Sequence, residues 1–408
     1  MEKGEEGGEG MTQLSVFECA FPPIKTKKKI RLIELFAGIG AQAKALENIG
    51  ADFEHWKVCE YDKYAVKSYN AIHGTSFKPS DIRNIHGEDL EISDLEKYFY
   101  IMTYSFPCQD ISTARKQRGM KKGEGTRSGL LWEVERILKE LSRGGQLPQM
   151  LLMENVPAVH GKRNVEDFAD WIRSLDDFGY QSYWKDLNAS DFGIPQNRDR
   201  CFMVSVLGRY SFSFPEGFQL EKSLEDMLEE EVAEKYFLSE DRVEKIQRDP
   251  YNTNLYIHEN GSGNIRSITA HESRGTSCVE VCRTIRTDGG GLLDKSHMWD
   301  LASVCVKLKK IGQLQLEGYF ESAGRIYSAS GICPTINTCG GGGREPMIEY
   351  ENRVRRLTER ELFRLMGFSD DDFNKASKVN SSTKLKKQAG NSIVVPILEA
   401  IFKQILED

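Results

Sequence analysis

The chain has 408 residues, of which 29% are charged and 39% hydrophobic, with a formal net charge of −7. No apolar run is long enough to span a bilayer, and the Gly- and Glu-rich start lacks the apolar segment of a signal peptide. We therefore expect a cytoplasmic protein with no membrane association. Much of the negative charge lies within 221–249, so the net charge does not exclude a nucleic-acid partner.

The nine cysteines follow no regular spacing. Cys278 and Cys282 are separated by three residues, and no CxxC pair occurs anywhere in the chain. This pattern predicts free thiols in a reducing compartment and no bound metal.

Residues 1–29 are expected to form a disordered tail. From residue 30, apolar runs typical of strands alternate with amphipathic runs typical of helices. The predicted strands are 30–36, 53–60, 99–104, 149–154, 180–187 and 201–206. The predicted helices are 41–49, 62–73, 128–141 and 164–178. This alternation predicts an α/β protein with a parallel, doubly wound sheet.

The texture of the chain changes after residue 207. An acidic run predicts a helix over about 221–248, and the glycine-rich stretch 257–344 predicts a separate, loop-rich domain with short β-strands. Regular structure is expected to return with a helix from Arg355 to Met366 and a last helix after Pro396.

A glycine-containing turn, Phe36-Ala37-Gly38-Ile39-Gly40, follows the first predicted strand and opens the first helix. Backbone N–H groups and the helix dipole at such a turn favour a polar or anionic ligand. Glu60 ends the next strand, where a carboxylate can accept hydrogen bonds from ribose hydroxyls. These residues predict a nucleoside-containing cofactor, and they leave a nicotinamide cofactor and S-adenosylmethionine both open.

Cys108 follows a buried strand within Phe106-Pro107-Cys108-Gln109. Taken alone, such a cysteine is more often a small buried hydrophobe than a nucleophile. Glu154 ends another apolar strand, so its carboxylate is expected at the same edge of the sheet as Cys108. Arg198 and Arg200 stand two apart in an extended segment and could hold a carbonyl oxygen or a phosphate, or pair with Asp199 at the surface.

The order of these motifs resembles that of the cytosine-5 DNA methyltransferases. The motifs are FAGIG, Glu60, Asp81-Ile82, FPCQ, ENV at 154–156, QNRDR at 196–200, RxLTxxE at 355–361 and GNS at 390–392. The resemblance covers about 31–206 and 353–408. It implies a Rossmann-like, S-adenosylmethionine-dependent catalytic domain over 30–206 plus 384–408. It also implies an inserted target-recognition domain, loop-rich and mostly β, over 207–383.

The resemblance also implies a reaction on double-stranded DNA. The thiolate of Cys108 would add to C6 of a flipped-out cytosine, and C5 would then take the methyl group. Glu154 would bond N3 and the exocyclic amine, and Arg200 would hold O2 with support from Arg198.

The remaining roles come from the same resemblance. Residues expected at the cofactor are Phe36, Ala37, Gly38, Ile39, Gly40, Glu60, Tyr61, Asp81, Ile82, Pro107, Leu130, Asn391 and Ser392. In the recognition region, a Thr followed by Leu or Ile is expected near the flipped base. This sequence offers the pair twice, as Thr284-Ile285 and Thr335-Ile336, and the second is favoured.

Family precedent is a monomer, and a restriction-modification, orphan or phage-borne enzyme fits the pattern. Three alternatives stay open from the sequence. They are cytosine-5 methylation of a structured RNA such as a tRNA, a non-catalytic DNA-binding relative, and a nicotinamide oxidoreductase suggested only by the glycine turn.

Overall fold

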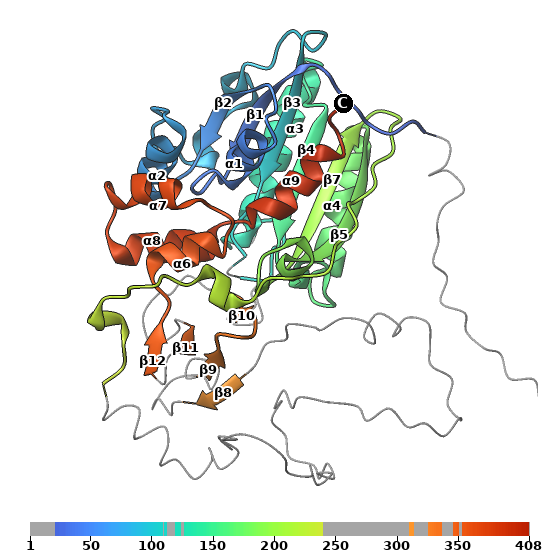
Figure 1. Cartoon of the computed structure of the whole chain (residues 1–408). Helices are drawn as coiled ribbons and strands as arrows, with labels where there is room; N and C mark the ends of the chain where they lie inside the picture. The colour runs from blue at the N-terminus through green and yellow to red at the C-terminus, as the bar shows by residue number, and fades with distance from the viewer. Residues whose placement is uncertain are drawn as a thin grey trace, which may run out of the picture.

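The structure is a computed structural model of the whole chain (Figure 1). It describes residues 21–108, 110–111, 119–123, 126–239, 310–313, 325–336, 346–350 and 353–407.

A six-stranded sheet forms the centre of the molecule, in the order β2-β1-β3-β4-β7-β5 (Figure 1). The strands are β1 (Lys29–Leu35), β2 (Phe53–Cys59), β3 (Tyr98–Tyr104), β4 (Met150–Asn155), β5 (Tyr180–Asn188) and β7 (Asp199–Leu207). Strands β3 and β4 are buried at every residue because helices cover both faces of the sheet. All six strands lie within one or two residues of their predicted bounds.

Strand β7 departs from the predicted parallel sheet. It lies between β4 and β5 and runs antiparallel to both. Only residues 189–198 connect β5 to β7, and they form the 3-10 helix η5 (Ala189–Phe192) and the short strand β6 (Gln196–Asn197). This connection is too short for the helical crossover that a parallel pair needs. The reversal brings the start of β7 to the edge where β1, β3 and β4 end.

Helices cover the two faces of the sheet as two separate layers. One layer holds α1 (Ala41–Asn48), α2 (Lys63–His73) and α9 (Val395–Lys403), and the other holds α3 (Leu131–Arg143) and α4 (Val165–Asp177). Helix α3 shows why these segments fold as helices. Its residues Leu131, Val134, Leu138 and Leu141 recur at three- and four-residue spacing and form one fully buried face. The predicted doubly wound α/β class is confirmed.

The C-terminal helix returns to the start of the chain. Helix α9 packs against α1, and Asn48 Nδ2 donates to Glu399 Oε1 at 2.7 Å. Residues 21–28, within the predicted tail, pack against the same part of the molecule. The backbone N–H of Ile24 donates to the Ser211 carbonyl at 2.9 Å, and the Ile24 side chain is buried. The Thr26 N–H donates to the Ile405 carbonyl at 2.8 Å, so the two ends of the described chain lie side by side (Figure 1).

The acidic helix predicted over 221–248 is wrong for its described part, 221–239. That part forms only the 3-10 helices η6 (Leu224–Met227) and η7 (Glu234–Tyr236). Its carboxylates are used in contacts with the C-terminal region, since Glu229 Oε1 accepts from Arg360 Nε at 2.9 Å. An acidic run without an apolar stripe has no face to bury as a helix.

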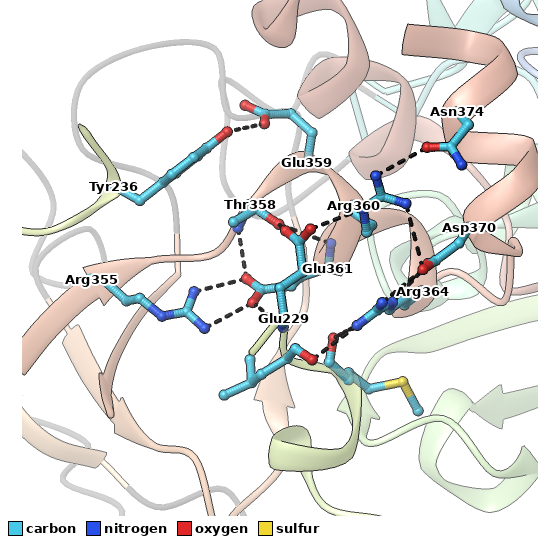
Figure 2. A network of polar contacts seen from close by, with 12 residues as sticks. Glu229, Tyr236, Arg355, Thr358, Glu359, Arg360, Glu361, Arg364, Asp370 and Asn374 are labelled. Atoms are coloured by element: carbon cyan, nitrogen blue, oxygen red, sulfur yellow. Dashed lines mark hydrogen bonds and ion pairs between the residues drawn. The ribbon is translucent and has the colours of Figure 1, made fainter. Parts of the chain in front are cut away.

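The helix predicted from Arg355 begins later, as α6 (Glu359–Arg364). Arg355 instead belongs to β12 (Arg353–Arg356), and Thr358 caps the helix by accepting from the Glu361 N–H. Figure 2 shows the result: the Arg355 guanidinium lies against the Glu361 carboxylate, with Nη1–Oε2 and Nη2–Oε1 distances of 2.9 and 2.8 Å. Both side chains are fully buried.

The remaining helices, α7 (Asp370–Ser377) and α8 (Ser382–Asn391), lie beside α2 (Figure 1). Asn380 Nδ2 and Gln388 Nε2 donate to the Tyr64 carbonyl at 2.7 and 2.9 Å. A second sheet, ordered β12-β11-β9-β8, includes β8 (Lys310–Gln313), β9 (Arg325–Ser328) and β11 (Met347–Tyr350). Among the described residues, no helix has the length and apolar character needed to cross a membrane.

Candidate active site

The carboxyl edge of the sheet gathers the predicted catalytic residues. Cys108 follows β3, and Glu154 stands near the end of β4. The antiparallel register pairs Glu154 with Phe202 and Asn155 with Cys201, which places Arg200, near the start of β7, at the same edge. The geometry thus assembles a thiol, a carboxylate and a guanidinium from three neighbouring strands.

The loop that carries Cys108 is fixed by two side chains. Asn155 Nδ2 donates to the Phe106 carbonyl at 2.9 Å, and Ser128 Oγ donates to the Pro107 carbonyl at 2.6 Å. Ser128 also accepts from the Asp110 N–H at 3.3 Å. These hydrogen bonds fix the backbone on both sides of Cys108, whose side chain is half-buried.

The environment of Cys108 disfavours its thiolate in the unliganded protein. Burial raises the pKa of the Cys108 thiol above its ordinary value, and the nearby Glu154 carboxylate raises it further. Arg200 and Arg198 act in the opposite direction. These influences together favour the Cys108 thiol over its thiolate.

Glu154 and Arg200 form a direct ion pair. Arg200 Nε lies 3.2 Å from Glu154 Oε1, and both side chains are largely buried. Burial raises the pKa of the Glu154 carboxyl, while Arg200 and Arg198 lower it. A buried carboxyl beside two guanidinium groups can therefore hold or release a proton within its pocket. Arg200 also donates to the Asp199 backbone carbonyl at 2.6 Å.

Arg198 is buried and joins three segments that lie far apart in sequence. Its Nη1 donates to the Ile336 carbonyl at 2.8 Å, and its Nη2 donates to the carbonyls of Ser392 at 2.7 Å and Gly390 at 3.2 Å. Burial, with the charge of Arg200, lowers the pKa of Arg198 to about 9. The contacts of Arg198 hold the start of β7, the GNS segment and Ile336 together.

The FAGIG turn follows β1 in a backbone shape that glycine favours. Gly38 and Gly40 have positive φ angles of 59° and 82°, and Phe36 has one of 60°. A Cβ atom on Gly40 would come within 2.4 Å of His73 Nε2 and 2.6 Å of a Tyr69 ring carbon. The turn therefore sits tightly against α2 and presents its outer backbone at the sheet edge.

Glu60 is tied to this turn through both carboxylate oxygens. The Gly38 N–H donates to Oε2 at 3.0 Å, and the Asp62 N–H donates to Oε1 at 2.7 Å. Burial raises the pKa of Glu60, and the two N–H groups oppose that rise. Each carboxylate oxygen keeps a lone pair, which fits a donor such as a ribose hydroxyl.

The other predicted cofactor residues differ in their surroundings. Tyr61, which directly follows Glu60, is 76% exposed, whereas Ile82 is buried. The Asp81 carboxylate accepts from Arg83 Nε at 3.0 Å, and this partner lowers the pKa of Asp81. Leu130 ends the 3-10 helix η3 (Ser128–Leu130), half-buried against the core. Asn391 ends α8 on the exposed side, and Ser392 is buried.

The predicted recognition pair Thr335-Ile336 lies against the segment that carries the arginines. Its neighbour strand β10 (Cys333–Pro334) pairs with β6, and Thr335 Oγ1 donates to the Asn197 carbonyl at 2.6 Å. Gln196 fixes the same point, because its Oε1 accepts from the Ile336 N–H at 3.1 Å and its Nε2 donates to the Leu365 carbonyl at 2.8 Å. The other predicted pair, Thr284-Ile285, lies outside the described residues.

Sequence reasoning assigned no role to Gln196, Ser128 or His73. Gln196 stood within the QNRDR motif, which was the signal that could have singled it out. Ser128 and His73 stood at ordinary helix ends, where nothing in the local pattern shows that their partners are Pro107 and Ile39.

Comparisons with known proteins agree on one family. A family model described as C-5 cytosine-specific DNA methylase matches residues 30–407. The chain is 31% identical to the type II methyltransferase M2.ScrFI of Lactococcus lactis subsp. cremoris, over 93% of this chain and 99% of that protein. It is 30% identical to the orphan methyltransferase M.SssI of Spiroplasma monobiae, over 93% of this chain and 97% of that protein.

Solved structures share the fold at lower identity. The Dnmt2 methyltransferase of S. pombe aligns with a TM-score of 0.58 and 19% identity, covering 91% of this chain and 97% of that one. The methyltransferase EhMeth of Entamoeba histolytica aligns with a TM-score of 0.61 and 14% identity, covering 93% and 98%.

Proposed function

Because the chain belongs to the C-5 cytosine-specific DNA methylase family, whose members use S-adenosylmethionine, we propose that it methylates cytosine within a specific duplex sequence through a covalent bond between Cys108 Sγ and cytosine C6. One observation supports this proposal above all others. The thiol of Cys108 lies at the sheet edge with the Glu154–Arg200 ion pair, and both members of that pair act on its pKa.

The proposed reaction begins with a cytosine that has left the base stack. Cys108 loses its proton to solvent, and its Sγ forms a bond to C6 while the ring electrons move toward C5 and N3. Glu154, whose pKa burial raises, first takes up a proton from solvent, passes it to N3 and so neutralises the charge that builds on the ring. As Glu154 becomes a carboxylate, Arg200 at 3.2 Å stabilises it.

Methyl transfer and release complete the sequence. S-adenosylmethionine, when bound, supplies an electrophilic methyl group that C5 accepts. C5 then loses its proton to a base, and the Sγ–C6 bond breaks as the C5–C6 double bond re-forms. N3 returns its proton to Glu154, which releases it to solvent, and the Cys108 thiolate regains a proton from solvent, so the site ends in its starting state. In this scheme the Arg200 guanidinium contacts O2 of the ring, and Arg198 supports Arg200.

The cofactor would be held by the turn and by Glu60. The left-handed backbone at Gly38 and Gly40 and the two spare lone pairs of Glu60 fit a nucleoside with a free ribose. Tyr61 is exposed where it could cover the adenine, while Asp81 and Ile82 line its edge. The further residues assigned to this site are Phe36, Ala37, Ile39, Pro107, Leu130, Asn391 and Ser392.

The domain assignment is part of the same proposal. Residues 30–206 with 384–408 would form the catalytic domain, and 207–383 would read the target sequence, with Thr335-Ile336 at the flipped base. The hydrogen bonds of Gln196 and Arg198 to Ile336 support this placement. We propose a monomer acting in the cytosol of a bacterium or phage-infected host, as a restriction-modification or orphan enzyme.

The deciding experiment is methylation mapping. Purified protein with S-adenosylmethionine and a duplex library should produce bisulfite-resistant cytosines in one sequence context, and Cys108→Ala should produce none. A duplex that carries 5-fluorocytosine should form a covalent adduct with the wild-type protein, because fluorine at C5 blocks the elimination step. Equal labelling of tRNA, or no labelled DNA from any context, would contradict the proposal.

A further inference from the structure

Three possible metal ligands from three elements converge beneath the cofactor turn. They are Glu47 in α1, His55 in β2 and His73 in α2, and their ligand atoms all lie within 4.8 Å of one another. His73 Nδ1 is 2.6 Å from Glu47 Oε1, and His55 Nε2 is 3.7 Å from the same oxygen. One carboxylate oxygen therefore faces two imidazole nitrogens.

The opposite nitrogen of each ring is already engaged. His73 Nε2 lies 3.1 Å from the Ile39 carbonyl, which can only accept, so Nε2 carries the hydrogen. His55 Nδ1 lies 2.9 Å from the Tyr69 hydroxyl, which itself donates to Glu34. Tyr69 therefore accepts from His55 Nδ1. In the neutral rings, the lone pairs of His73 Nδ1 and His55 Nε2 are left facing Glu47.

The lone pairs of the two ring nitrogens and the negatively charged carboxylate oxygen repel one another unless a positive charge lies between them. A single proton between His73 Nδ1 and Glu47 Oε1 removes the repulsion at that contact. It leaves His55 Nε2 facing the same oxygen with no proton between them. A divalent cation at the centre satisfies all three ligands together. Metal-bound histidines usually donate their second ring N–H to a carbonyl or to a hydrogen-bonded acceptor, as His73 and His55 do here.

We propose that Glu47, His55 and His73 form a binding site for a divalent transition-metal ion, zinc in particular, with water as the fourth ligand. Two imidazole nitrogens and one carboxylate oxygen are a donor set that zinc accepts in an open tetrahedral site. His73 is fully buried, whereas the Glu47 side chain is 30% exposed, which leaves a route for the ion and its water. The inference does not depend on the proposed methylation.

Lys44 limits the affinity of the site. Its Nζ lies 3.5 Å from Glu47 Oε2 and opposes a cation there, although Asp372 holds the same ammonium at 2.9 Å. We therefore expect micromolar binding of zinc. Because His73 contacts the Ile39 carbonyl, a bound ion would stiffen the FAGIG turn from behind. The ion would thus stabilise the cofactor half of the fold, a role that the sequence expectation of no metal did not include.

Zinc titration of the chelator-treated, full-length protein tests the site. In competition with a chromophoric chelator, the wild type should bind one zinc at micromolar concentration. Variants Glu47→Gln and His55→Gln should each weaken that binding more than tenfold, and His86→Gln, an exposed histidine elsewhere, should leave it unchanged. Glu47→Gln is the safer variant, because its half-exposed position tolerates substitution better than the buried His73 does.

Cobalt(II) separates this site from cysteine sites. A nitrogen and oxygen ligand set gives weak visible bands and no sulfur-to-metal charge-transfer band. Unchanged zinc binding in His55→Gln, or a requirement for millimolar zinc in the wild type, would overturn the proposal. So would a charge-transfer band that disappears in Cys201→Ser, because that result would place the ion at His160, Asp186 and Cys201 instead.

Discussion

Arg200 Nε lies 3.2 Å from Glu154 Oε1 because β7 runs antiparallel to β4 and so begins where β4 ends. The two charges of this pair act in opposite directions on the pKa of the Cys108 thiol. The carboxylate raises the pKa of the thiol, and the guanidinium lowers it. The balance between them is open to direct measurement.

Alkylation of Cys108 should follow that balance. Because burial and Glu154 raise the pKa of Cys108, its reaction with iodoacetamide should be slow at neutral pH and should accelerate above the ordinary thiol range. Glu154→Gln removes a negative charge, so the rate profile should move to lower pH. Arg200→Gln removes a positive charge, so the profile should move to higher pH. Peptide mapping by mass spectrometry assigns the modified cysteine, and shifts in the same direction for both variants would contradict the model.

Arg200→Lys tests geometry separately from charge. Lysine keeps the positive charge but cannot present the planar guanidinium that Arg200 offers to Glu154. We expect kcat to fall by about 10²–10³-fold, the usual loss for a group that stabilises charge in the transition state. The Kd for duplex DNA should change little. Equal losses in DNA affinity and in kcat would show that Arg200 acts mainly in binding.

Glu60→Gln should weaken the cofactor site. Glu60 accepts N–H groups from Gly38 and Asp62 on its two oxygens, and an amide can accept only one of them. The other N–H would face an NH₂ group. Loss of a hydrogen bond to a charged group corresponds to about a 10- to 100-fold rise in the Kd for S-adenosylmethionine. Calorimetric titration measures it, and Glu54→Gln, in the strand β2 that precedes Glu60, serves as the control.

Gly40→Ala should destabilise the fold more than Gly50→Ala does. Both glycines have positive φ angles, 82° and 67°, so both substitutions carry the backbone penalty of about 1–2 kcal/mol. Only Gly40 also brings the new Cβ within 2.4 Å of His73 Nε2, while Gly50 has nothing within 4 Å. Urea unfolding of the two variants isolates the steric contribution. Equal destabilisation would mean that the turn moves freely away from α2.

The buried pair Arg355–Glu361 offers a stability test where β12 leads into α6. Both side chains are fully buried, so Glu361→Gln removes the negative charge that faces the Arg355 guanidinium and should cost about 3–5 kcal/mol. Glu234→Gln breaks the exposed pair with Arg353 and should cost no more than about 1 kcal/mol. Thermal unfolding of both variants checks the difference. A similar effect of the two substitutions would show that Arg355 finds another acceptor.

Local patterns were enough to locate most of the regular structure. The apolar runs at β1, β3 and β4 are buried strands because apolar residues occupy both of their faces. The amphipathic run of α3 is a helix because its apolar residues fall on one side. The edge position of Cys108 and Glu154 followed as well, since the carboxyl ends of neighbouring parallel strands meet at one edge.

Contacts between distant residues decided what the sequence left open. The direction of β7 depends on the short link from β5, which allows only an antiparallel pairing with it. The start of α6 depends on the pairing of Arg355 with Ile348 and Glu361. The conformation of the acidic run 221–239 depends on its contacts with Arg360 and the residues around it.

The amino-acid sequence by itself determined the order of the strands and helices around the central sheet, the family, and the thiol, carboxylate and guanidinium at Cys108, Glu154 and Arg200. Only the tertiary structure decided that Arg198 ties Ile336 to Ser392 and that Glu47, His55 and His73 converge. The physical reason is that hydrophobic periodicity is a local property of the chain. Hydrogen bonds and ion pairs between side chains far apart in sequence form only after packing fixes which elements lie side by side.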